Sequence, residues 1–183
     1  MQKHSTHKTC CVIGHREIEI TEKLKREIYG YIENLIVNER VETFLFGSKS
    51  EFDDLCNGIV TKLKERYPYI KRVGYTCLCE TVTLEKDKET QERILSDSFK
   101  REVRLYCVDE ERESKKRVFS GKGAYVERNC EMIDDSDYCL FYYNKKYRPR
   151  QREYGSYTGN SGTAVAYEYA ERKNKTIKNF YEG

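Results

Sequence analysis

Short apolar runs alternate with segments of helical periodicity along most of this 183-residue chain, and this alternation constrains the fold more than any other feature. Each run is rich in β-branched or aromatic residues and has the length of a strand. Several runs are apolar at successive positions, as expected of strands that are covered on both faces. We expect strands at Thr9–Ile13, Val41–Phe46, Ile70–Cys79, Val103–Val108, Tyr138–Tyr143 and Thr176–Phe180.

Apolar residues spaced three or four positions apart lie between these runs and predict helices. The first helix has Leu24, Ile28 and Leu35 on one face, and Thr21 is a suitable N-cap for it. Three further helices are expected around Leu55–Leu63, Ala124–Ile133 and Ala164–Glu171. Because strand–helix–strand units cross over with one hand, the sequence predicts an α/β fold with an open, mostly parallel sheet and helices on both faces.

The segment Glu85–Arg117 departs from this pattern because 20 of its 33 residues are charged. We expect it to form a charged insertion, a solvated helix and loop, on the surface of one domain that spans residues 1–183. A mobile lid over a ligand site is the alternative.

The charges of the chain nearly cancel, since 34 Lys and Arg face 31 Asp and Glu and leave a net charge of +3. A dedicated nucleic-acid binder would be more basic, so nucleic acid is not the expected partner. No apolar run approaches the ~18 residues of a membrane span, and the first residues lack the apolar stretch of a signal peptide. We therefore expect a cytoplasmic protein with no membrane partner.

Eight cysteines are present, and most of them lie inside apolar runs. No CxxC pair occurs, and the CxC at Cys77 and Cys79 would place both thiols on one face of a strand. This pattern favours buried free thiols over a zinc site or a disulfide framework. We expect neither a bound metal nor a resident cofactor.

Small or basic residues follow the predicted strands at the edge where open parallel sheets bind ligands. Residues 14–16 (Gly-His-Arg) follow the first strand, and residues 47–50 (Gly-Ser-Lys-Ser) follow the second. Residues 161–163 (Ser-Gly-Thr) open an Ala-rich helix, whose free backbone N–H groups attract anions. These loops predict a phosphate-binding site, although the fingerprints GxGxxG and GxxxxGK[ST] are both absent.

Several short segments of the chain resemble the SLOG superfamily, and they are most similar to its YpsA-like branch. The segments are Cys11–Arg16, Phe46–Ser48, Arg128–Asp137, Ser161–Ala170 and Lys175–Asn179. The resemblance runs from about Cys10 to Phe180. It implies a Rossmann-like fold that binds nucleotides or NAD-derived ligands such as ADP-ribose. It assigns to the ligand pocket Gly14, His15, Arg16, Gly47, Ser48, Asp53, Ser161, Gly162 and Thr163.

The hydrolase branch of that superfamily carries a Gly-Gly-x-Gly-Thr-x-x-Glu motif, whose glutamate acts on the ribose. In this chain Ala166 occupies the glutamate position. Glu168 comes two residues later and so lies about 200° further round the helix. No catalytic residue is therefore assigned, and the departure favours binding over phosphoribohydrolase activity.

Individual candidates have alternative roles. His15 and Arg16 would hold a phosphate or a ribose, or form a structural turn. Asp53 would orient a ribose, or favour the start of its helix electrostatically. Asn129, beside Arg128, would contact a base edge or a ribose, or serve as a buried cap.

The run Lys145–Arg152 has five cations in eight residues and follows a predicted strand. It could close on a polyphosphate, contact a nucleic-acid backbone or form a solvated loop. Tyr154 and Tyr157, just beyond it, could stack on a base.

These observations predict a protein that senses or sequesters a nucleotide or an NAD-derived, ADP-ribose-like small molecule. One alternative is a nucleotide N-glycosidic (phosphoribo)hydrolase or transferase, in which Glu51 or Asp53 supplies the carboxylate. A second alternative is a DNA-interacting module that uses Lys145–Arg152. The 16 tyrosines would also suit the interface of a homodimer.

Overall fold

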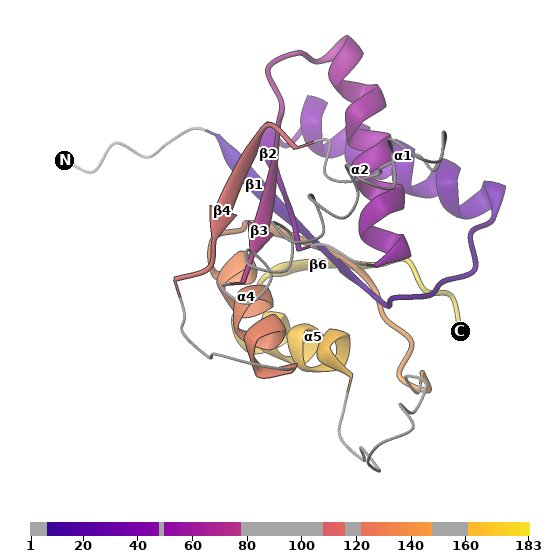
Figure 1. Cartoon of the computed structure of the whole chain (residues 1–183). Helices are drawn as coiled ribbons and strands as arrows, with labels where there is room; N and C mark the ends of the chain where they lie inside the picture. The colour runs from indigo at the N-terminus through magenta and orange to yellow at the C-terminus, as the bar shows by residue number, and fades with distance from the viewer. Residues whose placement is uncertain (1–6, 48–49, 78–107, 116–121, 148–160) are drawn as a thin grey trace, which may run out of the picture.

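A computed structural model describes residues 7–47, 50–77, 108–115, 122–147 and 161–183. These residues form a six-stranded sheet with helices on both of its faces (Figure 1). The strand order is β4-β3-β2-β1-β5-β6, and every neighbouring pair is parallel. The expected α/β, Rossmann-like open sheet is confirmed, and the sheet is parallel throughout.

The helices and strands follow the order that the hydrophobic pattern predicts. Their bounds are β1 (Lys8–Gly14), α1 (Glu22–Val37), β2 (Val41–Phe46), α2 (Glu51–Arg66), β3 (Lys71–Thr76), β4 (Glu110–Glu113), α4 (Lys122–Asp134), β5 (Tyr138–Tyr142), α5 (Gly162–Arg172) and β6 (Thr176–Asn179). The expected N-cap of α1 is also confirmed, because the Thr21 hydroxyl accepts the N–H of Leu24.

Two hydrophobic clusters lie on the two faces of the sheet. Helices α1 and α2 cover one face, and α4 and α5 cover the other (Figure 1). Strand β1 serves both clusters, since Cys10 and Val12 pack under α1 and α2 while Cys11 and Ile13 pack under α4 and α5. A central strand that is buried on both faces explains the unbroken apolar run that predicted it.

The edge strand β4 corrects two expectations about the charged segment. Of the strand expected at Val103–Val108, only Val108 is described, and it lies outside any strand. The strand is instead Glu110–Glu113, four exposed charged residues that lie inside the stretch expected to be helix and loop. An edge strand needs only backbone hydrogen bonds to one neighbour, here β3, so it requires no apolar residues.

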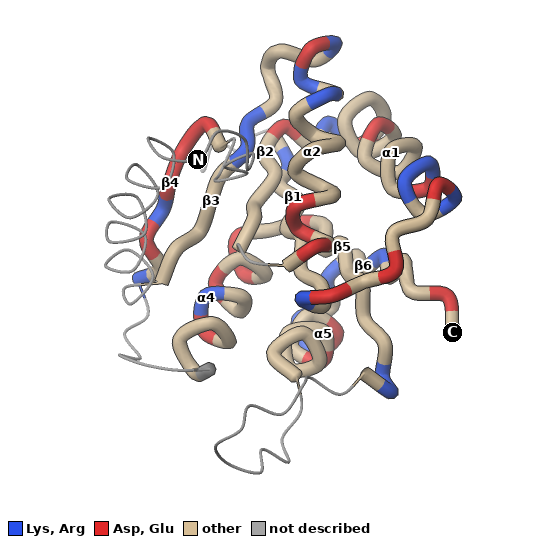
Figure 2. The backbone as a smooth tube through the Cα atoms, turned by 45° about the vertical axis from the view of Figure 1, so that its right-hand side comes forward, with Lys and Arg blue, Asp and Glu red and all other residues tan. Residues whose placement is uncertain are grey.

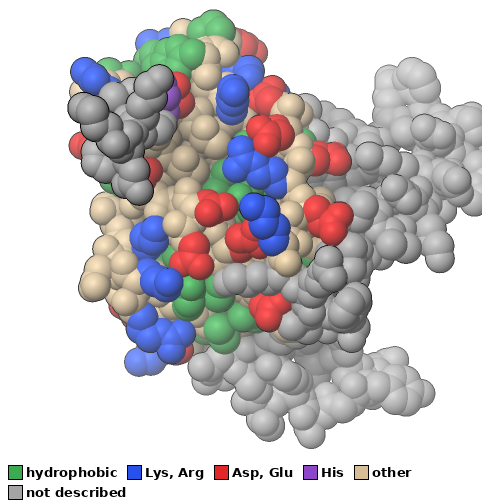
Figure 3. All heavy atoms as spheres, turned by 90° about the vertical axis from the view of Figure 1, so that its left-hand side faces the viewer, with side chains coloured by type: hydrophobic (Ala, Val, Ile, Leu, Met, Phe, Trp, Pro, Cys, Tyr) green, Lys and Arg blue, Asp and Glu red, His purple; other side chains and the backbone are tan. Residues whose placement is uncertain are grey.

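An ion pair between Arg72 and Asp109 fixes the start of this edge strand. The Arg72 guanidinium donates to both carboxylate oxygens of Asp109, at 3.1 and 2.9 Å, and the Arg72 backbone N–H donates to the same group. Hydrogen bonding from Arg72 holds the pKa of Asp109 well below its usual range. Figure 2 shows β4 as mostly red with a blue segment, and Figure 3 shows acidic and basic side chains intermixed on the adjoining face.

None of the helices in the described ranges combines the length and the apolar character that crossing a bilayer requires. The longest are α1 and α2, with 16 residues each, whereas a span needs about 20 apolar residues.

Candidate functional site

The order in which the chain adds strands to the sheet reverses between β1 and β5, and the candidate site lies at this switch point. From β1 the chain moves outward to β2 and β3 on one side, and later to β5 and β6 on the other. Open parallel sheets bind ligands outside the carboxyl ends of the strands at such a switch. Gly14 at the end of β1 pairs with Tyr142 at the end of β5. The loops after these two strands therefore begin side by side.

The start of α5 lies against the end of β1. The Thr163 hydroxyl donates to the carbonyl oxygen of Gly14, over 3.1 Å. Ser161 caps the helix by accepting the N–H of Ala164, also over 3.1 Å. The N–H groups of Gly162 and Thr163 precede the first intrahelical hydrogen bonds and have no acceptor within the described helix, an arrangement that attracts anions. The structure thus brings the predicted Ser-Gly-Thr turn to the predicted Gly-His-Arg loop.

His15 is a buried, neutral side chain with only 1% of its surface exposed. The backbone N–H of Asn144 donates to its Nε2 over 2.9 Å. Because Nε2 accepts, the single proton of the neutral ring belongs on Nδ1. Burial lowers the pKa of His15 to about 4, so the ring is uncharged at neutral pH. Nδ1 is buried, and among the described residues it has no hydrogen-bond partner.

The first residues of the basic run form a turn that packs on His15. The Tyr147 ring stacks on the imidazole with a centroid separation of 3.9 Å and an interplanar angle of 20°. Asn144 fixes the turn, because its carbonyl accepts the N–H of Tyr147 and its side chain accepts the N–H of Lys146. Lys145 and Lys146 are exposed beside the site. Residues 148–152, Tyr154 and Tyr157 lie outside the described residues.

Tyr147 and Asn144 are contributions that the sequence reasoning missed. Tyr147 lies within the basic run, whose cations dominate the pattern, and Asn144 directly precedes that run. An Asn directly after a strand is a turn signal, which could have identified the tight turn at this point.

The loop after β1 is attached to the first turn of α2. The carbonyl of Arg16 accepts the N–H of Glu51 over 3.0 Å, and the Glu51 carboxylate accepts the N–H of Ile18 over 2.8 Å. Arg16 itself is exposed. Glu51, one of the two carboxylates considered for catalysis, therefore holds the loop in place.

Gly47, Asp53, Arg128 and Asn129 come together where β2 ends. A Cβ atom added to Gly47 would lie 3.0 Å from Nη2 of Arg128, so the guanidinium occupies the space beside this glycine. The same guanidinium donates to Oδ1 of Asn129 over 3.3 Å. The predicted Ser48 lies outside the described residues.

Asp53 is the second unusual titratable group of the site. It is 6% exposed, and burial raises its pKa to about 7, although the charge of Arg128 favours ionisation. Its Oδ1 is buried and has no hydrogen-bond partner in the described part of the chain. Its backbone N–H donates to the Ser50 hydroxyl, which caps α2.

We call the region outside the ends of β1, β2 and β5 the crevice, after the position where open parallel sheets bind ligands. Helix α5 supplies no carboxylate to it. Ala166, at the position of the hydrolase glutamate, is fully buried in the cluster beneath α4 and α5. Glu168 is exposed. Ala166 and Glu168 therefore lie on different faces of α5, as their spacing along the helix predicts.

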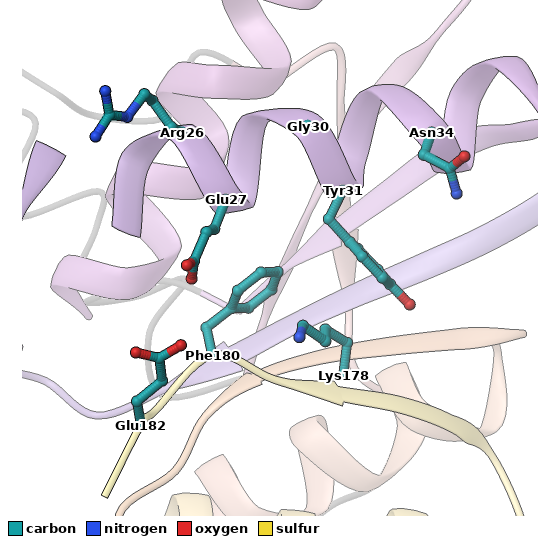
Figure 4. Close-up of a pocket in the computed structure, with 8 residues that line it drawn as sticks. All are labelled: Arg26, Glu27, Gly30, Tyr31, Asn34, Lys178, Phe180 and Glu182. Atoms are coloured by element: carbon teal, nitrogen blue, oxygen red, sulfur yellow. The ribbon is translucent and has the colours of Figure 1, made fainter. Parts of the chain in front are cut away.

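A groove of about 520 Å³ lies elsewhere, between α1 and the C-terminal segment (Figure 4). None of the predicted site residues lines it; the lining residues are Arg26, Glu27, Gly30, Tyr31, Asn34, Lys178, Phe180 and Glu182. The Tyr31 and Phe180 rings meet edge to face, and Lys23 pairs with both Glu27 and Glu182. In these contacts the side chains in and around the groove pair with one another, and the contacts give no indication of a ligand.

The cysteines do not form a metal site in the described part of the chain. No group of three or more His, Cys, Asp or Glu side chains is placed to hold a metal ion among the described residues. The six cysteines described are free thiols, and all except Cys130 are buried. Cys79 and Cys107 lie outside the described residues.

Comparisons with known proteins give no family for this chain. No protein-family model matches the sequence, and no curated protein matches it. The features that bear on function are therefore those of the crevice at the ends of β1, β2 and β5.

Proposed function

We propose that this chain binds a nucleotide or an NAD-derived, ADP-ribose-like small molecule in the crevice at the ends of β1, β2 and β5, and acts as a sensor or sequestering protein. The observation that carries the proposal is His15, a buried neutral side chain whose Nδ1–H lacks a partner among the described residues. A buried donor of this kind requires an acceptor, and phosphate oxygens are strong acceptors.

The surroundings of His15 suit a small anion. The open N–H groups at the start of α5 lie beside Gly14, the residue before His15. Lys145 and Lys146 add two exposed positive charges next to the Tyr147 stack. Elsewhere Lys and Arg alternate with Asp and Glu over both helical layers, without one dominant sign (Figure 2). This distribution favours one local phosphate site over a surface for a long polyanion.

The resemblance to the SLOG superfamily supports the same ligand class. Its YpsA-like branch is similar to this chain in the loops after β1 and β2 and at the start of α5. The alanine at position 166 favours binding without turnover by the mechanism of the hydrolase branch.

Binding can be tested on the purified full chain. Mass spectrometry of the denatured protein would identify a copurified small molecule, and calorimetric titration with AMP, ADP-ribose and NAD would measure affinity. We expect Arg16→Ala to weaken the best ligand by about 10-fold, the effect of one charge-assisted hydrogen bond. Thr163→Val, which removes the hydroxyl that joins α5 to Gly14, should weaken it by about the same factor because it displaces the start of the helix. Arg26→Ala, an exposed arginine on α1, is the matched control. The proposal fails if none of the three ligands binds, or if both site variants bind as the wild type does.

A second candidate, an N-glycosidic hydrolase, has one specific observation in its favour. Asp53 has a pKa near 7 because it is buried, and a carboxyl group with that pKa suits general acid catalysis at a leaving base. Incubation with AMP and chromatography for free adenine would test it. Unchanged AMP would eliminate this activity and leave the binding proposal standing.

The DNA-interacting alternative stays a prediction. It depends on Lys145–Arg152, of which residues 145–147 are described. Binding through this run would weaken steeply as salt rises, because condensed counterions are released from the nucleic acid.

A further inference from the structure

Nδ1 of His15 and Oδ1 of Asp53 are buried at the crevice without hydrogen-bond partners among the described residues, and one is a donor while the other is an acceptor. Nδ1 of His15 is a donor, because Nε2 of the same ring accepts the N–H of Asn144. Oδ1 of Asp53 is an acceptor when the carboxyl is ionised. Buried polar groups in native proteins are nearly always paired, so each atom requires a complementary partner.

The two atoms lie on different sides of the end of β1. His15 is on the α5 side, through the hydrogen bond between Thr163 and Gly14. Asp53 is in the first turn of α2, where its neighbour Phe52 packs directly on Gly14. A Cβ added to Gly14 would come within 2.4 Å of Phe52, so α2 and the end of β1 are in close contact. Asp53 lies with Gly47 and Arg128 where β2 ends, and His15 lies against Asn144 after β5, so a ligand placed across the end of β1 would extend toward both residues.

The surroundings of the two atoms also differ: groups that attract negative charge lie on the His15 side, and a carboxyl group lies on the Asp53 side. The His15 side has the open N–H groups of α5 and the exposed Lys145 and Lys146, which together favour negative charge. The Asp53 side has a carboxyl group next to the Arg128 guanidinium. A phosphate offers acceptors and would be repelled by an ionised carboxylate. A hydroxyl can donate to Asp53 while its oxygen accepts from a neighbouring donor.

We infer that the crevice is polarised, so that a ligand's phosphate binds beside His15 and a ribose hydroxyl donates to Oδ1 of Asp53. This inference rests on the proposed function and specifies it. The ligand class is a ribonucleotide whose hydroxyls are recognised, and a deoxyribonucleotide is discriminated against.

The test is a set of calorimetric titrations of the full chain with pyrophosphate, AMP, 2′-deoxy-AMP and 3′-deoxy-AMP. We expect the wild type to prefer AMP over one of the deoxy forms by about 10-fold, as one hydrogen bond to a charged group provides. Asp53→Ala should abolish this preference and leave pyrophosphate affinity within about 3-fold. His15→Phe, which retains a ring for Tyr147 to stack on, should weaken all four probes and preserve the preference.

Asp54→Ala is the matched control, because Asp54 is exposed in the same turn of α2. If Asp53→Ala does not fold, Asp53→Asn retains the size of the side chain and should reduce the preference to about 3-fold. Pyrophosphate and AMP binding without discrimination against either deoxy form would overturn the inference while the proposed function stands. Discrimination that survives in Asp53→Ala would overturn it as well. Failure of every probe to bind the wild type would overturn the inference, and failure of ADP-ribose and NAD as well would remove the proposed function itself.

Discussion

The Thr163 hydroxyl donates to the carbonyl oxygen of Gly14 across 149 positions of sequence and joins the start of α5 to the end of β1. Both residues belong to the side of the crevice that we assign to a phosphate. The position of the α5 N–H groups relative to His15 therefore depends on a direct contact between two distant segments.

Replacing Thr163 by valine removes this hydrogen bond with little change in side-chain shape. We expect the free energy of unfolding to fall by about 1 kcal/mol and AMP affinity to fall by about 10-fold. Urea unfolding and calorimetry measure the two effects. Thr163→Ser, which retains the hydroxyl, should restore most of both. Wild-type affinity in Thr163→Val would show that this contact does not position the helix for binding.

Gly14 has no room for a side chain. An added Cβ would lie 2.4–2.6 Å from three atoms of Phe52, so α2 or β1 would have to move. We expect Gly14→Ala to lower the free energy of unfolding by about 1–3 kcal/mol, the usual range for overpacking. Gly58→Ala is a control on the same helix as Phe52, and open space surrounds it. That variant should gain about 0.5–1 kcal/mol, because alanine favours a helix interior. Equal stability of the two variants would contradict the packing at Gly14.

The titrations of Asp53 and His15 have opposite effects on stability. Burial raises the pKa of Asp53 from 3.8 to about 7, so the native state retains a proton that the unfolded chain releases between these values. Stability from this group falls as pH rises through that window. Burial lowers the pKa of His15 from 6.5 to about 4, so the unfolded chain binds a proton that the native state lacks. Stability from this group rises with pH between 4 and 6.5.

Single variants separate these two contributions. Relative to the wild type, Asp53→Asn should gain stability as pH rises from 4.5 to 6.5, by up to ~1.4 kcal/mol per pH unit. His15→Phe should lose stability over the same interval. Denaturant unfolding at pH 4.5, 5.5 and 6.5 measures both, and Asp54→Asn serves as the exposed control. A difference from wild type that does not vary with pH would show that the group titrates normally in the native state.

The buried thiols should resist modification in the folded protein. Burial raises the pKa of Cys10, Cys11 and Cys56 well above the ordinary thiol value, which suppresses the reactive thiolate. Cys130 is only half-buried. In a chain with Cys79→Ser and Cys107→Ser, we expect iodoacetamide to alkylate Cys130 first, as peptide mass spectrometry would show. Equally fast alkylation of Cys10 would contradict a closed core.

The sequence identified the parts of the fold that depend on apolar patterning. Strands β1 and β5 are buried on both sides, so their composition alone reveals them. Strand β4 has no apolar residue, and its place in the sheet depends on backbone pairing with β3 and on the Arg72–Asp109 ion pair. Neither interaction leaves a local pattern in the sequence.

For the candidate site, the sequence predicts where the loops lie but not the protonation states of their side chains. The loops after β1 and β2 and the start of α5 could be located, because the topology of parallel sheets brings strand ends together. The protonation states of His15 and Asp53 could not, since they arise from burial and from contacts with distant residues. The stack of Tyr147 on His15 is likewise a tertiary contact, between segments more than a hundred residues apart.

The charged composition of β4 also limits how the molecule can associate with itself. The strand has three glutamates and one arginine, all exposed, at the edge of the sheet that the described residues form. If β4 of a second copy paired antiparallel with this β4, glutamates of the two strands would lie close to one another across the pairing. Like charges across paired strands are destabilising, so this edge opposes continuous sheet growth from molecule to molecule.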